Sequence, residues 1–167
     1  MIGLVLVTHG DIAGTLRAAT EHVVGSQTQL ATLPIGPHDD IARCREALEA
    51  CIAQVEDGDG VLLLTDMFGS TPSNLAISMM NRPGIEVIAG VNLPMLVKLA
   101  KVRCSRTLDE CTAIAELAGR KYIAAASSLP ATCLGGAACC GGSAAAPEPA
   151  AEQPARPARI PDPALAG

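Results

Sequence analysis

Short, mainly apolar stretches recur along the chain, and each of the first four is followed by a segment with a helical pattern. These stretches cover residues 2–7, 30–35, 61–65, 85–89 and 121–126. The most strand-like of them is 61–65. The first stretch is continuously apolar rather than alternating, which is typical of a strand that is buried on both faces of a sheet, whereas 30–35 is a weaker strand signal. The pattern therefore predicts four buried strands and a short fifth one.

The segments between these strands carry helical patterns with recognisable ends. In the segment after residue 40, apolar residues as far as Val55 form one stripe along a helix. Further helices are predicted over 12–24, from Thr71 or Pro72 onwards, over 92–102 and from Thr107 to Gly119. The signals for helix starts and ends are Asp11, Asp39 or Asp40, Pro72, a Thr107–Glu110 capping box, Gly25 and Gly119.

Strands that alternate with helices predict an α/β fold: an open, doubly wound, mainly parallel sheet with helices on both faces. Ligands bind such a sheet at the carboxyl ends of its strands, where the strand order reverses. With the order 2-1-3-4, the reversal lies between the first and third strands, which lead into His9 and Asp66. Neighbouring strands are about 4.8 Å apart, so these two side chains are expected to meet.

The composition restricts the core and the class of partner. Hydrophobic residues make up 49% of the 167 residues, but Tyr122 and Phe68 are the only aromatic ones, so the predicted core is aliphatic. A net charge of −5 without stacking aromatics argues against nucleic-acid binding. No apolar run approaches the roughly 20 residues of a membrane span, and the first strand is too short for a signal peptide. We therefore expect one cytoplasmic domain.

Seven cysteines are present, and none forms a C-x-x-C pair. Two pairs, Cys44 with Cys51 and Cys104 with Cys111, have the spacing of one helix face, which favours reduced thiols that pack as small apolar residues. Support for a metal site among the cysteines is weak, and we predict neither a metal nor a cofactor. The thiols expected to be exposed and oxidisable are Cys133, Cys139 and Cys140.

The composition changes near the end of the chain. Residues 135–167 are dominated by Ala, Gly and Pro, with six prolines between Pro147 and Pro163. Such a segment buries too little apolar surface to offset its ordering entropy. We therefore predict a folded domain over residues 1–126 and a disordered tail over 127–167.

The residues expected at the reversal point form a consistent set for phosphoryl chemistry. A neutral imidazole such as that of His9 is a good nucleophile, and histidine can carry a covalent intermediate. A carboxylate such as Asp66 fixes the tautomer of the imidazole and supports its developing positive charge. After Asp66, the chain continues with a glycine, two hydroxyl side chains and the start of a helix. Together these groups favour binding of an anion. The predicted phosphoryl-binding residues are Thr8, Gly10, Gly69, Ser70 and Thr71.

Each of these residues also has a purely structural interpretation. A histidine at a strand end is often structural, and Asp66 is able to cap the next helix. The convergence of the set at one predicted edge favours function. His22 and His38 have no such setting, and are expected on a helix surface and in a solvated turn.

Three segments resemble the mannose-family EIIA proteins of the bacterial sugar phosphotransferase system. They are "VTHG" after the first strand, "LLTDMFGSTPSNLA" at the third and "EVIAGVNLPML" at the fourth, within a similarity that extends from residue 1 to about 126. The resemblance implies the 2-1-3-4 sheet and a fifth, antiparallel strand that is exchanged across a homodimer. Thr71 stands where the family often has a phosphoryl-contacting serine.

The resemblance also implies the partners. His9 is expected to accept a phosphoryl group from phospho-HPr, as a phosphohistidine beside Asp66, and to pass it to an EIIB protein. Membrane contact is expected only indirectly, through a sugar permease complex. Some family members continue through an Ala/Pro-rich linker into an EIIB domain, whereas this sequence ends after the tail. A stand-alone regulatory phosphocarrier is therefore the alternative to a transport component.

Other function classes fit the sequence less well. A receiver domain places its phosphorylated aspartate where Asp66 lies, but its Mg²⁺ needs acidic residues where this chain has Thr8-His9-Gly10. No G-x-x-x-x-G-K-[ST] or G-x-S-x-G motif is present, which argues against P-loop enzymes and α/β-hydrolases. A non-catalytic binding module remains as a competing hypothesis, which a phosphorylation assay distinguishes.

Overall fold

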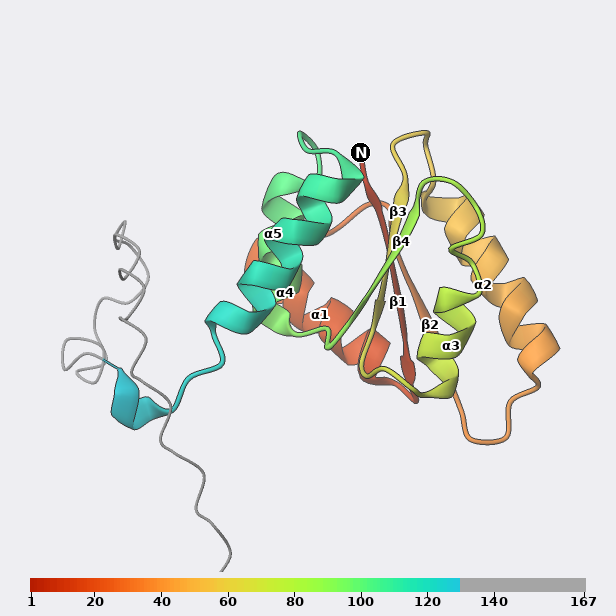
Figure 1. Cartoon of the computed structure of the whole chain (residues 1–167), viewed down its shortest axis with the longest axis horizontal. Coiled ribbons are helices and arrows are strands. Elements are labelled where there is room, and N and C mark those ends of the chain that lie inside the picture. The colour runs from red at the N-terminus through yellow and green to blue at the C-terminus, as the bar shows by residue number, and fades with distance from the viewer. Residues whose placement is uncertain (130–167) are drawn as a thin grey trace, which may run out of the picture. The chain divides into compact units, whose positions relative to one another are not determined.

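The computed structural model describes residues 1–129, and residues Met1–Ala125 form one compact unit (Figure 1). A second unit begins at Ala126, and its described part contains one 3-10 helix, Ala126–Ser128. The strands of the first unit are β1 (Gly3–His9), β2 (Leu30–Ile35), β3 (Val61–Thr65) and β4 (Ile85–Ala89). Its helices are α1 (Ile12–Val24), α2 (Ile41–Val55), α3 (Thr71–Ile77), α4 (Leu93–Val102) and α5 (Leu108–Lys121).

The four strands form one parallel sheet in the order β2-β1-β3-β4. This confirms the predicted sheet and its reversal between the first and third strands. The register pairs Val7 with Thr65 across β1 and β3, and His9 with Ile35 across β1 and β2. Because all strands run the same way, His9 and the residue after Thr65 reach the same edge of the sheet.

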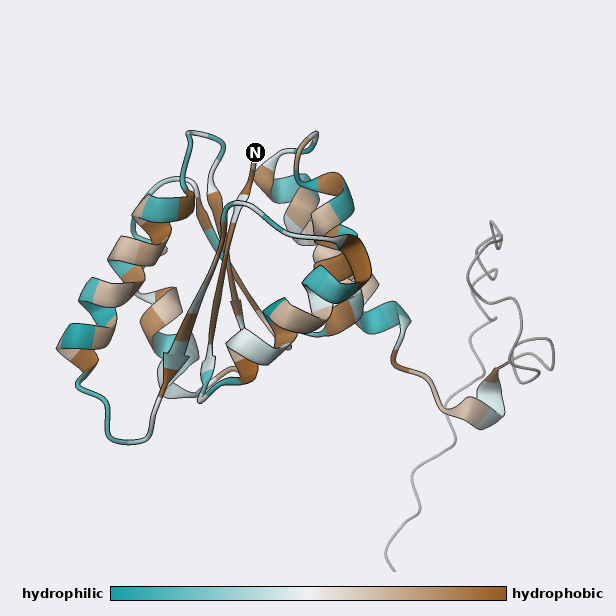
Figure 2. Ribbon diagram, turned by 180° about the vertical axis from the view of Figure 1, so that it is seen from behind, coloured by the Kyte–Doolittle hydropathy of each residue, from teal (hydrophilic) through white to brown (hydrophobic). Residues whose placement is uncertain are grey.

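Two aliphatic clusters cover the two faces of the sheet, as the continuous apolarity of the strands requires. On one face, α2 and α3 pack against alternate strand residues such as Val5 and Leu63. On the other, α1, α4 and α5 pack against the intervening ones, such as Leu6 and Leu64. Figure 2 shows the hydrophobic strands between helices that carry both hydrophobic and hydrophilic residues. His9 thus ends β1, a central strand of a sheet that helices cover on both faces.

The structure corrects two predictions at the end of this domain. Gly119 does not end α5, which continues to Lys121. Gly119 instead stands at a close contact between helices, since an added Cβ would lie 2.8 Å from the Cε atom of Met95. Residues 122–125 have no regular structure, so the predicted strand at 121–126 is absent from the single chain. A strand needs a hydrogen-bonded neighbour, and pairing with a second copy remains a proposal. The part of the predicted tail from residue 130 onwards, which includes Cys133, Cys139 and Cys140, lies outside the described residues.

A buried arginine joins three segments at the opposite edge of the sheet. Arg103 is only 2% exposed, and its guanidinium donates to the carbonyl oxygens of Ile2, Thr28 and Gln29 and to the side-chain oxygen of Gln27. These distances run from 2.6 to 3.2 Å. Burial lowers the Arg103 pKa, since the charge is surrounded by protein rather than water. Arg103 therefore ties the end of α4 to β1 and to the loop before β2.

We predict that Arg103→Met lowers the free energy of unfolding by about 2–4 kcal/mol, because several buried carbonyl groups lose a charged donor. Urea denaturation followed by circular dichroism measures this loss. Arg106→Met is the matched control, since Arg106 is exposed and pairs with Glu110 at one helical turn. Equal losses of unfolding free energy in the two variants would show that the buried hydrogen bonds of Arg103 stabilise the fold no more than an exposed ion pair does.

Candidate functional site

His9 and Asp66 contact each other at the carboxyl edge of the sheet, as the sequence predicts. His9 is the last residue of β1, and Asp66 directly follows β3. The ring Nδ1 lies 2.8 Å from Asp66 Oδ2, and the backbone N–H of His9 donates to the same oxygen at 3.0 Å. The His9 side chain is 48% exposed, whereas that of Asp66 is 17% exposed. The hydrogen bond to the largely buried Asp66 carboxylate thus orients the half-exposed imidazole of His9.

The charge on Asp66 decides which ring nitrogen of His9 is free. Burial of the carboxyl raises its pKa, but hydrogen bonds from the His9 backbone and ring and from the Met67 backbone hold the Asp66 pKa below its ordinary value. Ionised Asp66 therefore favours the folded state, a contribution that is lost as the pH falls through the lowered pKa. An ionised carboxylate only accepts hydrogen bonds, so Nδ1 carries the proton and Nε2 keeps its lone pair.

Thr8 fixes the corner between β1 and α1. Its side chain is fully buried, and its hydroxyl oxygen accepts a hydrogen bond of 2.8 Å from the backbone N–H of Ala13. Thr8 thereby caps the first turn of α1, where Asp11 stands as the N-cap residue but makes no side-chain capping bond. The β1–α1 corner is therefore fixed by the residue immediately before His9.

Gly10 forms the corner that exposes the imidazole. Its φ of +47° lies in the left-handed region, which favours glycine, and its N–H donates to the carbonyl oxygen of Ile35 at 2.9 Å. Apart from its two chain neighbours, no described residue has an atom within 4 Å of the position that a Cβ would take. Gly10 thus turns the chain sharply beside His9 and leaves the adjacent space open.

The residues predicted to bind an anion lie on the loop from Asp66 into α3. Gly69 is exposed with a φ of +79°, and Thr71 is the exposed first residue of the helix. Ser70 caps this helix: its hydroxyl donates to the Met67 carbonyl at 2.9 Å and accepts from the Ser73 N–H at 3.4 Å. The Ser70 hydroxyl is therefore engaged in shaping the loop, whereas Thr71 is placed on the exposed surface.

Exposed apolar side chains flank the pair, a feature that our sequence interpretation missed. Ile12, at the start of α1, is 44% exposed, and Met67 and Phe68, directly after Asp66, are 57% and 63% exposed. We call these three residues the apolar rim. The signal in the sequence was the pair of large apolar residues in a loop that otherwise has helix-start chemistry. Exposed apolar side chains beside a reactive group are typical of a protein-docking surface.

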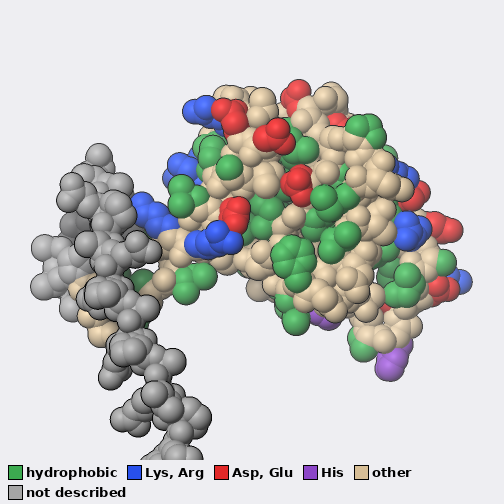
Figure 3. Space-filling view, viewed as in Figure 1, with side chains coloured by type: hydrophobic (Ala, Val, Ile, Leu, Met, Phe, Trp, Pro, Cys, Tyr) green, Lys and Arg blue, Asp and Glu red, His purple; other side chains and the backbone are tan. Residues whose placement is uncertain are grey.

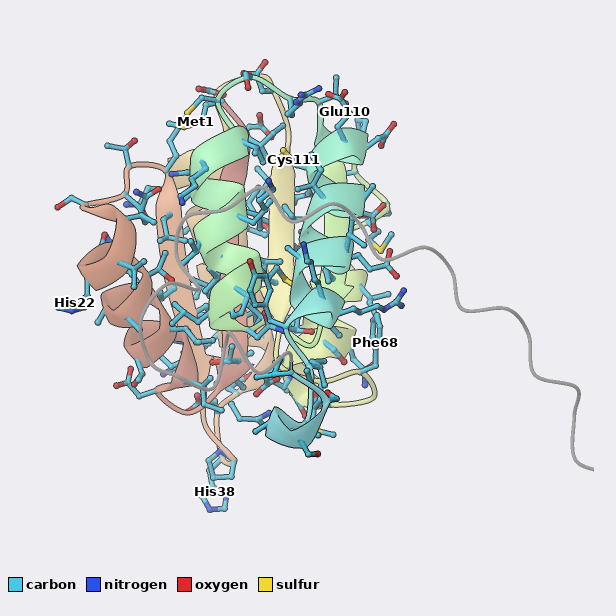
Figure 4. All side chains as sticks on the ribbon, turned by 90° about the vertical axis from the view of Figure 1, so that its left-hand side faces the viewer. Met1, His22, His38, Phe68, Glu110 and Cys111 are labelled. Carbon is cyan, nitrogen blue, oxygen red and sulfur yellow. The ribbon has the colours of Figure 1, made fainter. Side chains whose placement is uncertain are left out.

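The other two histidines lie on the surface. Figure 4 shows His22 on α1 and His38 at the tip of the loop after β2, and both are exposed. Cys44, Cys51, Cys104 and Cys111 are free thiols, and burial raises the pKa of Cys44, Cys51 and Cys111. Residues 1–129 contain no group of three or more His, Cys, Asp and Glu side chains arranged to hold a metal ion.

None of the helices within residues 1–129 has both the length and the apolar character needed to cross a bilayer.

Comparison with known proteins gives a consistent family signal. The family model described as "PTS system fructose IIA component" matches residues 3–116. The mannose-specific EIIAB component of Escherichia coli is 32% identical over 151 residues, which cover 89% of this chain and 47% of that protein. The fructose-specific EIIA component of Bacillus subtilis is 29% identical over 62% of this chain and 71% of its own length. This chain thus spans about half the length of the E. coli relative.

Solved structures show the same fold. The mannose/sorbose-specific IIA subunit from Enterococcus faecalis superposes with a TM-score of 0.68 at 28% identity, covering 77% of this chain and 96% of that subunit. The EIIA component from Streptococcus agalactiae gives a TM-score of 0.71 at 23% identity, covering 77% of this chain and all of that one. The parallel sheet described above is therefore shared with proteins of this class.

Proposed function

Because the chain belongs to the mannose family of EIIA components of the bacterial sugar phosphotransferase system, we propose that His9 accepts a phosphoryl group from phospho-HPr and passes it to an EIIB partner. The observation that carries this proposal is the hydrogen bond between His9 Nδ1 and Asp66, which leaves Nε2 as the exposed nucleophile. General participation in sugar phosphotransfer follows from the family, and this geometry supports His9 as the acceptor residue.

The transfer step uses the lone pair on His9 Nε2. This nitrogen attacks the phosphorus of the donor, so a new N–P bond forms while the bond between phosphorus and the donor breaks. The electron pair of the broken bond stays with the donor. Positive charge develops on the imidazole during attack, and the Asp66 carboxylate at 2.8 Å stabilises it. Transfer to EIIB repeats the same exchange with His9 as the donor.

The phosphoryl oxygens need hydrogen-bond donors and an open approach. Gly10 supplies the approach, since no described atom occupies the space beside it. The Thr71 hydroxyl and the N–H groups of Gly69 and Thr71, at the α3 start, are the proposed donors. Thr8 and Ser70 act indirectly, because both hydroxyls are already engaged in capping helices.

Both protein partners must bring a reacting atom within bonding distance of Nε2, so both must dock on the surface around His9. The apolar rim of Ile12, Met67 and Phe68 supplies such a surface. A regulatory carrier with no permease of its own remains the alternative, and contact with a membrane is proposed only through a permease complex.

Phosphorylation by a reconstituted system tests this proposal. The full chain is incubated with radiolabelled phosphoenolpyruvate, enzyme I and HPr, and then with an EIIB protein. We expect label on the chain only when HPr is present, with no requirement for a metal beyond that of enzyme I. Absence of label would refute the carrier function, and retention of label after addition of EIIB proteins would favour the regulatory alternative.

We further propose a homodimer in which the segment after α5 pairs with the free edge of β4 in a second copy. The supporting feature is a pocket of about 360 Å³ along that edge, lined by β4 residues such as Val87 and Ala89 and by Ile123, which is 79% exposed. An added strand would cover these apolar groups and satisfy the edge. The domain itself is proposed to span residues 1–126, with 127–167 dispensable for phosphorylation.

Light scattering of the full chain is expected to give about twice the monomer mass of 17.0 kDa. Ile123→Asp should shift the chain towards monomer, because it places a charge in the covered edge. Ile41→Asp, at an exposed position of α2, is the matched control and should leave the mass unchanged. A stable, active monomer of the unsubstituted chain would contradict the strand exchange.

A further inference from the structure

A groove runs between α4 and α5, next to the end of α1, and shares no residue with the phosphoryl site. The two helices lie side by side facing the viewer in Figure 4, and the groove volume is about 740 Å³. Its apolar lining residues are Val23, Leu93, Pro94, Val97, Val102, Ile114, Leu117, Ala118 and Tyr122. Its charged lining residues are Lys98, Lys101, Arg106 and Lys121.

Both helices are apolar on two sides, which a helix that merely covers a sheet does not require. Leu96 and Leu99 of α4 and Ala115 of α5 are buried against the sheet. The apolar residues facing the groove are mostly half-buried, and the most open of them are Val23, Leu117 and Tyr122, which are 55%, 70% and 69% exposed. The second apolar side is therefore available to a partner.

The groove is lined by positive charges, although the chain as a whole is negatively charged. The chain carries a net charge of −5, yet its only three lysines, Lys98, Lys101 and Lys121, all line the groove and are all exposed. Arg106 pairs with Glu110 at 3.2 Å, so the three lysines supply most of the positive charge of the groove. No carboxylate of the described residues lines the groove. In Figure 3, Lys and Arg side chains lie beside hydrophobic ones on the side where Figure 1 places α4 and α5.

We propose that the α4–α5 groove binds an amphipathic, acidic helix of a partner protein. Two neighbouring helices leave a groove that accepts a third helix, whose apolar stripe meets the floor while its carboxylates reach the lysines. A second copy of this chain fits less well, since a two-fold contact centred here brings the lysines of both copies together. An anionic membrane would meet the lysines as well, so lipid vesicles are included in the test below.

A synthetic peptide of about 15 residues, roughly four helical turns, serves as the probe, with leucines on one face and glutamates elsewhere. Titration into the isotope-labelled full chain, followed by amide chemical shifts, locates the binding surface and gives the affinity. We expect saturable shifts along α4 and α5, and weaker binding as salt rises from about 0.05 to about 0.5 M. A peptide with lysines in place of the glutamates should not bind.

Two variants separate charge from apolar contact. Lys98→Glu with Lys101→Glu should weaken peptide binding by about tenfold or more, because two attractions become repulsions. Arg43→Glu with Arg45→Glu makes the same charge change on exposed positions of α2 and should alter the affinity by less than about twofold. Leu117→Asn should also weaken binding, since it removes an apolar contact from the floor.

Other outcomes would overturn the proposal. These are shifts outside the groove, equal weakening by the two double variants, or binding to phosphatidylglycerol vesicles in place of the peptide. Self-association that the double lysine variant abolishes would instead assign the groove to a second copy. Because no groove residue belongs to the His9 site, phosphorylation by phospho-HPr should persist in the lysine variant. Failure of the groove proposal is thus distinguishable from failure of the phosphocarrier function.

Discussion

His9→Ala is expected to abolish phosphoryl acceptance from phospho-HPr, reducing labelling of the chain to background. The substitution removes Nε2, the exposed ring nitrogen that the Asp66 contact leaves unprotonated. The fold should persist, because the side chain is 48% exposed and the backbone N–H of residue 9 still donates to Asp66. Circular dichroism and a thermal denaturation curve of the variant verify this directly.

His38→Ala is the matched control, since His38 is exposed in a loop that follows the neighbouring strand β2. We expect it to be phosphorylated at the rate of the unsubstituted chain. Mass spectrometry of the labelled protein should place the modification on His9, as a linkage that is labile in acid and stable in base. Labelling that persists in His9→Ala would move the acceptor to another residue and remove the main support for the proposed mechanism.

The sheet and the pairing of His9 with Asp66 were predictable because parallel strands impose simple rules. Buried strands are continuously apolar, and the carboxyl ends of parallel neighbours meet at one edge. Once β1 and β3 are neighbours, a residue at the end of one must lie near the residue that follows the other. This logic needs no detailed side-chain packing, and it locates the pair correctly.

Details that depend on tertiary contact were not predictable in the same way. Glycine is a residue type that often ends helices, but at position 119 the lack of a side chain allows close packing against Met95. Asp11 is a residue type typical of an N-cap, yet the side chain that accepts the capping hydrogen bond from the Ala13 N–H is that of Thr8, five residues before Ala13. In both cases a local preference was overridden by a contact between elements, which the periodicity of the sequence does not record.

The groove between α4 and α5 illustrates the same limit. Leu117 and Val97 belong to helical stripes that predict burial, and the sequence does not tell a stripe facing the sheet from one facing solvent. Only the packing of Leu96, Leu99 and Ala115 against the sheet shows that the second stripe is left over. The clustering of all three lysines around that stripe likewise requires the fold.

Asp66→Asn is expected to slow phosphoryl acceptance by roughly 10² or more, the range typical of orienting and acid–base groups. Asp66 Oδ2 contacts the backbone N–H and the ring Nδ1 of His9, while Oδ1 accepts from the Met67 N–H at 3.0 Å. An asparagine amide has an NH₂ group in place of one of the two oxygens. In one orientation this NH₂ faces the backbone N–H of His9, and in the other it faces that of Met67, so a hydrogen bond is lost in both. If the NH₂ faces His9, it also donates to Nδ1, which moves the ring proton to Nε2 and removes the nucleophile.

Loss of the negative charge acts in the same direction, since a carboxylate about 4 Å from a positive imidazole contributes up to about 4 kcal/mol at an effective dielectric near 20. Rapid-quench measurement of transfer from phospho-HPr gives the rate. Asp39→Asn is the matched control, because the Asp39 carboxylate accepts a hydrogen bond from the Gly36 N–H in the loop after β2 rather than from His9. If Asp66→Asn reacts within about threefold of the unsubstituted chain, the carboxylate only fixes the loop and the charge mechanism is wrong.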